Sequence, residues 1–284
     1  MKKLFFLFSA FLMMLLTSCS DERDFGNGYA WGFPLNETDS LAMVKIYKAM
    51  GYDSWTDKNN IDLKKHKTWD GECTIKFDKE NKEFRIVEIS IDFRINQSFA
   101  EFQGSFVIPD EVSQMTRLTG ANFIGSESVR ICNVSALTDC PLEYLAIGYG
   151  DFNEKILFEE LPKLSATLTR LRIAVSGLSG SLEWILKFPH LELADLPNNE
   201  YSGKVPDIFK YSDCNVGLFF NNFDEMDWSY FTDPKVNKVP NLQRNRLQGE
   251  IPQEVFDSQN WIYFHNNVVG QQEGCSYTNW NGYY

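Results

Sequence analysis

The stretch LELADLPNNEYSGKVP, residues 191–206, returns in a second version, PNLQRNRLQGEIP, at residues 240–252. In both stretches an asparagine is followed at the same offsets by a hydrophobic residue, a glycine and a Val-Pro or Ile-Pro pair. A weaker copy, FFNN at residues 219–222, lies between them, and Asn199, Asn222 and Asn245 stand 23 residues apart each time. A fixed period of this length indicates a chain built from repeated structural units.

The register of this repeat extends in both directions. Counting back from Asn199 reaches Ser176, and looser copies place Gly150, Ser126 and Arg94 at the corresponding position. A last copy spans residues 261–270. The sequence therefore predicts eight units, of which three match strongly and five are inferred from the register, with an insertion of about eight residues in the first unit.

Each unit has the pattern of one short strand. Its apolar residues alternate with exposed positions at a period of two, so that one face of the strand is buried. A single unit cannot bury its leucines, and neighbouring units must therefore stack around a shared core. We expect the asparagine to point inward and to bind backbone groups that would otherwise be buried without a partner.

These motifs resemble the plant-type leucine-rich-repeat family, whose consensus runs L-x-x-L-x-L-x-x-N-x-L-x-G-x-I-P. The resemblance covers residues 84–270. It implies an α/β repeat fold, a leucine-rich-repeat solenoid with a curved parallel sheet on its concave side. It also implies an irregular or 3-10 convex side and a small helical N-terminal cap.

The cap is expected over residues 36–83. Helical spacing of apolar residues runs from Leu41 to Gly51, and the glycine is a suitable stop. The segment from Trp69 to Cys73 is similar to the W-x-G-x-x-C-like segment that precedes the first strand in the resembled family. That family usually pairs two cysteines in its cap, whereas this chain offers only one there.

Residues 1–18 have the features of a signal peptide: two lysines, an apolar run too short to span a membrane, and a polar end. The sequence LTSC at residues 16–19 resembles a bacterial lipobox. The resemblance implies cleavage before Cys19 and acylation of that cysteine with fatty acids such as palmitate. The alternative is an ordinary secretory peptide in which the cysteine is coincidental.

Residues 19–35 predict an acidic, flexible tether. The run SDERD at residues 20–24 is similar to export signals that send some Gram-negative lipoproteins to the outer surface, although a charged tether has the same composition. The expected location is the outer membrane of a Gram-negative bacterium, at the cell surface, with a periplasm-facing position as the alternative. At the other end, the aromatic residues 271–284 predict a tail that either caps the last repeat or stays loose.

Five cysteines follow Cys19, and an odd number leaves at least one thiol unpaired. Cys132 and Cys140 are close enough in sequence to bridge a loop. Cys214 occupies a leucine position of its repeat, which predicts a small buried hydrophobic side chain. No C-x-x-C pair is present, so the sequence does not predict a structural zinc site.

The composition argues against several kinds of partner and chemistry. The chain has a formal net charge of −12, and nucleic-acid binding requires clustered Lys and Arg, so we expect no nucleic-acid partner. Its three histidines are far apart, and it contains no phosphate-binding loop, dinucleotide-binding motif or nucleophile turn. The acidic residues 224–227 lack the ligand order of a calcium loop, which favours a solvated turn. We expect neither enzymatic activity nor a bound cofactor or metal.

The candidate binding surface is the concave face of the predicted sheet. Residues that flank the inward apolar positions point outward there, and exposed aromatic and arginine side chains are enriched at interface hot spots. The candidate ligand-binding residues are Tyr144, Tyr149, Arg170, Arg172, Asp195, Phe220, Arg244, Phe264 and His265. For any one of them, packing against a neighbouring unit is as good an explanation as ligand contact.

Three functions are compatible with this sequence. The first is a non-enzymatic, surface-displayed lipoprotein that recognises a protein ligand, because most members of the resembled family recognise proteins or peptides. The second is a glycan-binding lipoprotein, which aromatic residues converging in a cleft would favour. The third is a hydrolytic enzyme, which requires a deep pocket with two neighbouring carboxylates or a histidine–carboxylate pair.

Overall fold

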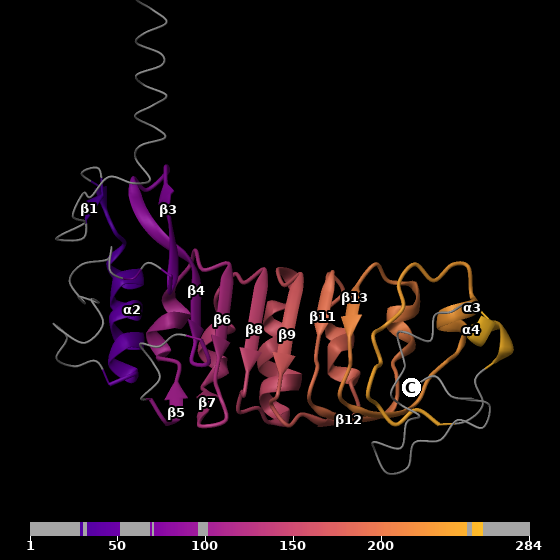
Figure 1. Ribbon diagram of the computed structural model, residues 1–284. Coiled ribbons are helices and arrows are strands. Elements are labelled where there is room, and N and C mark those ends of the chain that lie inside the picture. Colours follow the sequence, from indigo (N-terminus) through magenta and orange to yellow (C-terminus); the bar gives the residue numbers. More distant parts are fainter. Residues whose placement is uncertain are drawn as a thin grey trace, which may run out of the picture.

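The computed structural model describes residues 29–30, 33–51, 69, 71–95, 102–248 and 252–257. They form an elongated stack in which the strands lie side by side along the long axis (Figure 1). No helix within these ranges is long and apolar enough to cross a membrane. The predicted signal peptide, Cys19, the eighth unit at residues 261–270 and the tail at residues 271–284 lie outside the described residues.

The main sheet has seven strands in the order β13-β11-β9-β8-β6-β4-β3. Successive repeats contribute one parallel strand each: β4 (Glu83–Asp92), β6 (Gly120–Ile124), β8 (Tyr144–Gly148), β9 (Arg170–Ala174), β11 (Leu193–Asp195) and β13 (Asn215–Gly217). The next repeat adds an isolated parallel bridge between Gly217 and Asn241. The predicted solenoid is therefore confirmed, and seven of the eight predicted units fall within the described residues.

Alternating burial along each strand explains why the units stack. On β9, Leu171 and Ile173 are fully buried, whereas Arg170 and Arg172 are exposed. The inward residues of all the strands join one contiguous hydrophobic core. Burying one such aliphatic side chain contributes about 1.5–3 kcal/mol. The units on either side of a repeat together shield its inward side chains from water.

Along one edge of the main sheet, the chain forms a second set of short strands and then a helical turn in most repeats (Figure 1). The second sheet is parallel and consists of β10 (Ser179–Gly180), β12 (Glu200–Lys204) and β14 (Asn222–Glu225). Nearer the N-terminus β5 (Gly104–Val107) pairs with β7 (Val129–Cys132) in the same parallel sense. These strands were not predicted from the sequence, because they are too short to show a period.

The predicted 3-10 convex side is confirmed. The 3-10 turns are η3 (Asp110–Gln114), η4 (Val134–Leu137), η6 (Leu161–Ala166), η7 (Glu183–Lys187) and η8 (Asp207–Tyr211). One π-type turn, η5 (Ile156–Glu160), precedes η6. Two short α-helices, α3 (Ser229–Thr232) and α4 (Gln253–Asp257), lie at the far end of the stack (Figure 1).

A ladder of buried asparagines connects neighbouring repeats. The Asn199 amide donates to the carbonyls of Ile173 and Leu196, at 2.8 and 3.2 Å. The Asn221 amide donates to the carbonyls of Leu196 and Leu218, both at 3.0 Å. Each asparagine therefore binds the leucine carbonyl of its own repeat and the equivalent carbonyl of the preceding one. The amide of Asn245 repeats the pattern on Leu218 and Leu242.

The middle position of this ladder corrects the prediction that placed Asn222 there. Asn221 is 1% exposed, whereas Asn222 is half-buried and begins β14. The repeats are 22 and 24 residues apart at this point instead of 23, so that counting at a constant period gives the wrong neighbour. Ser176 is buried at its predicted position, and its hydroxyl accepts the backbone N–H of Gly150 at 2.9 Å.

The predicted helix, α2 (Glu37–Ala49), closes the N-terminal end of the stack. Asn36 caps this helix, since its side chain accepts the backbone N–H of Asp39. Gly51, with φ of 88°, ends this segment in a left-handed conformation that suits glycine. A strand that was not predicted, β3 (Cys73–Asp78), pairs antiparallel with β4 and forms the edge of the main sheet. Two further short strands, β1 (Tyr29–Ala30) and β2 (Phe33–Pro34), precede the helix.

A buried ion pair fixes α2 to the first repeat. The carboxylate of Asp39, which is 0% exposed, accepts from Nε and Nη2 of Arg85 at 2.8 and 3.0 Å. The same carboxylate accepts the backbone N–H of Ile86 at 2.9 Å. The hydrogen bonds from Asp39 raise the pKa of the Arg85 guanidinium further, so that the guanidinium stays charged. The cap is thus attached through charge as well as through the apolar face of α2.

The cysteines of the described residues are all free thiols. Cys140 is 3% exposed, and its Sγ donates to the carbonyl of Val112 in the preceding repeat at 3.1 Å. Its thiol therefore points into the core, and the Cys132–Cys140 bridge left open by the sequence is not formed. Burial raises the pKa of Cys140 to about 12, which keeps this thiol unreactive. Cys214 is buried, as predicted.

Candidate ligand-binding face

The outer face of the main sheet, which we call the sheet face, carries two columns of side chains in register. The first column consists of Glu88, Gly120, Tyr144, Arg170, Leu193 and Asn215. The second consists of Ser90, Asn122, Ala146, Arg172, Asp195 and Gly217. Small residues interrupt both columns, at Gly120 in the first and at Ala146 and Gly217 in the second, which leaves room for neighbouring large side chains to lean across the strand.

Tyr144 and Arg170 stack across the β8–β9 boundary. The guanidinium carbon of Arg170 lies 5.1 Å from the centre of the Tyr144 ring, within the range of a cation–π contact. Burial raises the pKa of Tyr144, and the positive charges of Arg172 and Arg170 oppose that rise. Arg170 itself is exposed and forms no ion pair within the described part of the chain.

Arg172 and Asp195 form an ion pair across the β9–β11 boundary, with Nη1 and Oδ2 2.8 Å apart. The arginine side chain is 45% exposed and the aspartate side chain 17%. The carboxylate fits there because it lies over Gly217, where a Cβ would approach Asp195 Oδ1 to within 2.3 Å. Burial raises the pKa of Asp195, and the positive charge of Arg172 offsets only part of that rise.

A second line of residues runs along the edge of the sheet, where each strand ends. Five successive repeats place a non-glycine residue with φ of 53–57° there, directly before the ladder position. These residues, which we call the left-handed column, are Tyr149, Val175, Asn198, Phe220 and Arg244. Asparagine tolerates this conformation, but a β-branched residue such as Val175 does so at a cost. A backbone hydrogen bond to the next repeat offsets part of that cost, as where the N–H of Asn198 donates to the carbonyl of Phe219 at 3.1 Å.

Phe220 and Arg244 are stacked within this column. The guanidinium carbon of Arg244 lies 4.7 Å from the centre of the Phe220 ring. Phe219 packs against the same ring edge-on, with the centroids 6.0 Å apart. Phe220 nevertheless remains 38% exposed, so that one part of the ring is available to a ligand.

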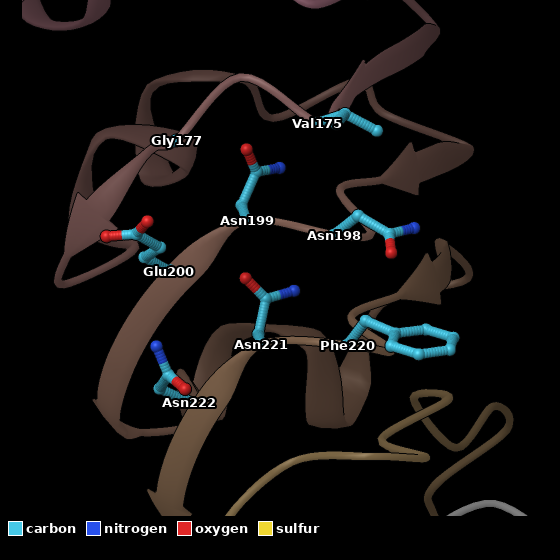
Figure 2. A pocket seen from close by; sticks show the side chains of 8 residues that line it. All are labelled: Val175, Gly177, Asn198, Asn199, Glu200, Phe220, Asn221 and Asn222. Carbon is cyan, nitrogen blue, oxygen red and sulfur yellow. The ribbon is translucent and has the colours of Figure 1, made fainter. Parts of the chain in front are cut away.

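A shallow depression of about 400 Å³ lies between the left-handed column and the second sheet (Figure 2). We call it the rim depression. Its lining residues are Val175, Gly177, Asn198, Asn199, Glu200, Phe220, Asn221 and Asn222. In Figure 2 the ladder amides of Asn199 and Asn221 lie one above the other in the middle, with Asn198 and Phe220 on one side and Glu200 and Asn222 on the other.

The structure divides the predicted site into two groups. Tyr144, Arg170, Arg172 and Asp195 lie on the sheet face and form one connected cluster, which we call the central cluster. Tyr149, Phe220 and Arg244 lie instead in the left-handed column, at the strand ends. Phe264 and His265 lie outside the described residues. The sequence reasoning missed the small residues of the sheet face and the left-handed column, although the regular L-x-x-N spacing marks the column's position.

The acidic segment at residues 224–227 is engaged in protein contacts. Asp227 accepts from Lys210 Nζ and from the hydroxyl of Ser229, both at 2.7 Å, and these bonds lower its pKa. Within the described ranges there is no group of three or more His, Cys, Asp or Glu side chains that could hold a metal ion.

Three solved structures are similar to this chain in the following measures. One is the leucine-rich-repeat ectodomain of the plant membrane receptor kinase GASSHO1/SCHENGEN3 from Arabidopsis thaliana in complex with CASPARIAN STRIP INTEGRITY FACTOR 2. This match has 14% sequence identity and a TM-score of 0.52, and it covers 78% of this chain and 28% of that chain. Another is PEPR1-AtPEP1, with 17% identity, coverage of 81% and 30%, and a TM-score of 0.49. A plant ice-binding protein matches with 19% identity, coverage of 78% and 83%, and a TM-score of 0.45.

The first of these matches shows that the chain has the leucine-rich-repeat fold. The chain spans less than a third of the length of that receptor ectodomain and of the PEPR1-AtPEP1 chain. No protein-family model matches the sequence, and no curated protein matches it significantly.

Proposed function

We propose that this leucine-rich-repeat chain is a non-enzymatic binding protein whose central cluster recognises a protein or peptide ligand. The observation that carries the proposal is the arrangement of Tyr144, Arg170, Arg172 and Asp195 on the sheet face. Tyrosine and arginine are over-represented among the residues that dominate binding energy. The fold supports the proposal as well, since the GASSHO1/SCHENGEN3 ectodomain is in complex with another protein factor.

The cluster also defines a charge for the ligand. Arg170 is exposed, its ring contact with Tyr144 holds its guanidinium in place, and no carboxylate of the described residues pairs with it. Asp195 neutralises Arg172 instead. A preorganised guanidinium of this kind binds a carboxylate in a bidentate manner. We therefore propose a ligand that presents an acidic side chain or a chain terminus to Arg170 and an apolar group to Tyr144.

Selection from a random peptide library on the immobilised chain, residues 20–284, tests this proposal. The expected result is enrichment of peptides with an acidic residue next to an aromatic or aliphatic one. Arg170→Ala should weaken a selected peptide by about 10- to 100-fold, the loss of one hydrogen-bonded charge pair. Asn215→Ala, an exposed position of the same column, is the matched control and should leave the affinity unchanged. Binding that both variants leave intact would place the site elsewhere.

We further propose that the protein is displayed on the surface of a Gram-negative bacterium and anchored by a lipid on Cys19. The support is the LTSC sequence at residues 16–19 and the acidic run that follows it. Expression in a Gram-negative host with labelled palmitate is the direct test. We expect the label in the wild-type chain and its complete loss in Cys19→Ala, with Cys73→Ala as the control that retains it. Label retained by Cys19→Ala would rule out this anchor.

A further inference from the structure

The rim depression contains polar side chains whose hydrogen-bonding capacity is unused. The side chains of Asn198, Glu200 and Asn222 form no hydrogen bond or ion pair with any other described residue. All three line the same depression, and Figure 2 shows them on both sides of the asparagine ladder. Together they offer two amide groups, each both donor and acceptor, and one carboxylate acceptor.

Apolar surface lies next to these groups. Phe220 and Val175, which are 38% and 37% exposed, also line the depression, and in Figure 2 their side chains extend from the left-handed column to the outer side of the ladder, as that of Asn198 does. Arg244 belongs to the repeat after Phe220 and covers the ring from that side, so the side of the ring toward Asn198 is left open. Gly177 contributes no side chain, and a Cβ there would meet no atom within 4 Å, which keeps the depression accessible.

The floor of the depression is rigid. The Asn199 amide is saturated by carbonyls of its own and the preceding repeat, and its Oδ1 accepts the N–H groups of Ser176 and Leu178. Asn221 is held in the same way and accepts the N–H of Tyr201. Since a ligand does not need to order these groups, little free energy is lost on binding.

We infer that the rim depression is a binding site for a neutral sugar residue. An open aromatic face receives the C–H side of a pyranose ring, while amide and carboxylate groups beside it bind neighbouring hydroxyls. The volume of about 400 Å³ falls in the range of small-ligand sites. No Lys or Arg lines the depression and Glu200 carries a negative charge, so uronates, sulfated sugars and phosphates are disfavoured.

This site is separate from the central cluster that we propose for the protein ligand. Its residues lie beyond the strand ends and on the second sheet, whereas Tyr144 and Arg170 lie at the opposite ends of their strands, as the first residues of β8 and β9. The aromatic residues Tyr144 and Phe220 do not converge in one cleft, since β9 and β11 separate their repeats. The sugar therefore binds at the rim and not across the sheet face.

Titration of the chain with neutral tetrasaccharides tests the inference. The probes are mannose, glucose, galactose and xylose tetrasaccharides, with tetragalacturonate as the acidic comparison, and the readout is calorimetry. We expect at least one neutral probe to bind and tetragalacturonate not to bind. Asn198→Gly keeps the left-handed backbone and removes the amide, and it should weaken that probe about tenfold, as should Asn222→Ala.

Arg170→Ala serves as the control and should leave sugar affinity unchanged, because it removes a central-cluster side chain outside the depression. Urea unfolding of each variant verifies that the fold is intact. The inference is overturned if no neutral probe binds up to its solubility limit, if tetragalacturonate binds best, or if sugar binding survives Asn198→Gly combined with Asn222→Ala. Loss of sugar binding in Arg170→Ala would also overturn it. Peptide binding is measured separately, so each proposal can fail alone.

Discussion

Replacing Asp39 by alanine is expected to lower the free energy of unfolding by about 3–5 kcal/mol, because the buried Arg85 then loses its nearest counter-charge and keeps only Glu83, at 3.5 Å. The Arg85 side chain is only 8% exposed, so most of its charge is shielded from water. The backbone N–H of Ile86 loses its acceptor in the same variant. Urea unfolding monitored by circular dichroism measures the effect, and a reduced m-value would indicate that the cap detaches before the repeats unfold.

An exposed ion pair of similar length supplies the control. Lys204 Nζ lies 2.7 Å from Asp207 Oδ2, but the two side chains are 48% and 53% exposed. Asp207→Ala should therefore cost no more than about 1 kcal/mol. The double variant Asp39→Leu with Arg85→Met removes both buried charges and should regain part of the loss. If Asp39→Ala is no more destabilising than Asp207→Ala, the ion pair does not hold the cap.

The strands of the solenoid could be predicted because their signal is local and repeated. Burial of Leu171 and Ile173 between exposed arginines follows directly from a period of two, and stacking is the one way to bury such short strands. The cap helix had the same kind of signal. β3 was missed even though residues 73–78 alternate apolar and polar side chains, because the segment lies outside the repeat register and its place at the sheet edge depends on antiparallel pairing with β4.

The error at Asn222 shows which spacing in the sequence is fixed by the structure. In each of the three repeats the ladder asparagine follows a buried leucine by three residues, as Asn221 follows Leu218. This offset is fixed by the turn that brings the amide back to that leucine's carbonyl. The repeat length is not fixed, because the convex segments differ in length. Counting from the leucine therefore gives the correct residue, whereas counting from the previous asparagine does not.

Only part of the candidate site could be predicted, because strand register is visible in the sequence whereas contacts between neighbouring strands are not. Register alone places Tyr144, Arg170, Arg172 and Asp195 on the outer face, and the structure agrees. Their mutual contacts depend on the size of the residue on the next strand, such as Gly217 beneath Asp195. The left-handed column depends on backbone angles that side-chain patterns do not reveal, since it holds a tyrosine, a valine and an arginine as well as an asparagine.

Asn221→Ala is expected to destabilise the protein by about 2–3 kcal/mol. The substitution leaves the N–H of Tyr201 without its acceptor and takes one donor from the carbonyls of Leu196 and Leu218, all in the buried interior. An unsatisfied buried backbone group costs about 1–3 kcal/mol, whereas the carbonyls keep their second donors from Asn199 and Asn245. The measurement is the free energy of unfolding in urea.

Asn222→Ala is the matched control, because the two asparagines are adjacent and only one belongs to the ladder. The Asn222 side chain faces the rim depression and makes no hydrogen bond with other described residues, so its loss should change stability by less than about 0.5 kcal/mol. Equal effects of the two substitutions would mean that the amide ladder does not join the repeats. A large effect of Asn221→Ala alone would show that the stacking of repeats depends on the asparagine side chain, whose amide in each repeat donates to a backbone carbonyl of the repeat before it.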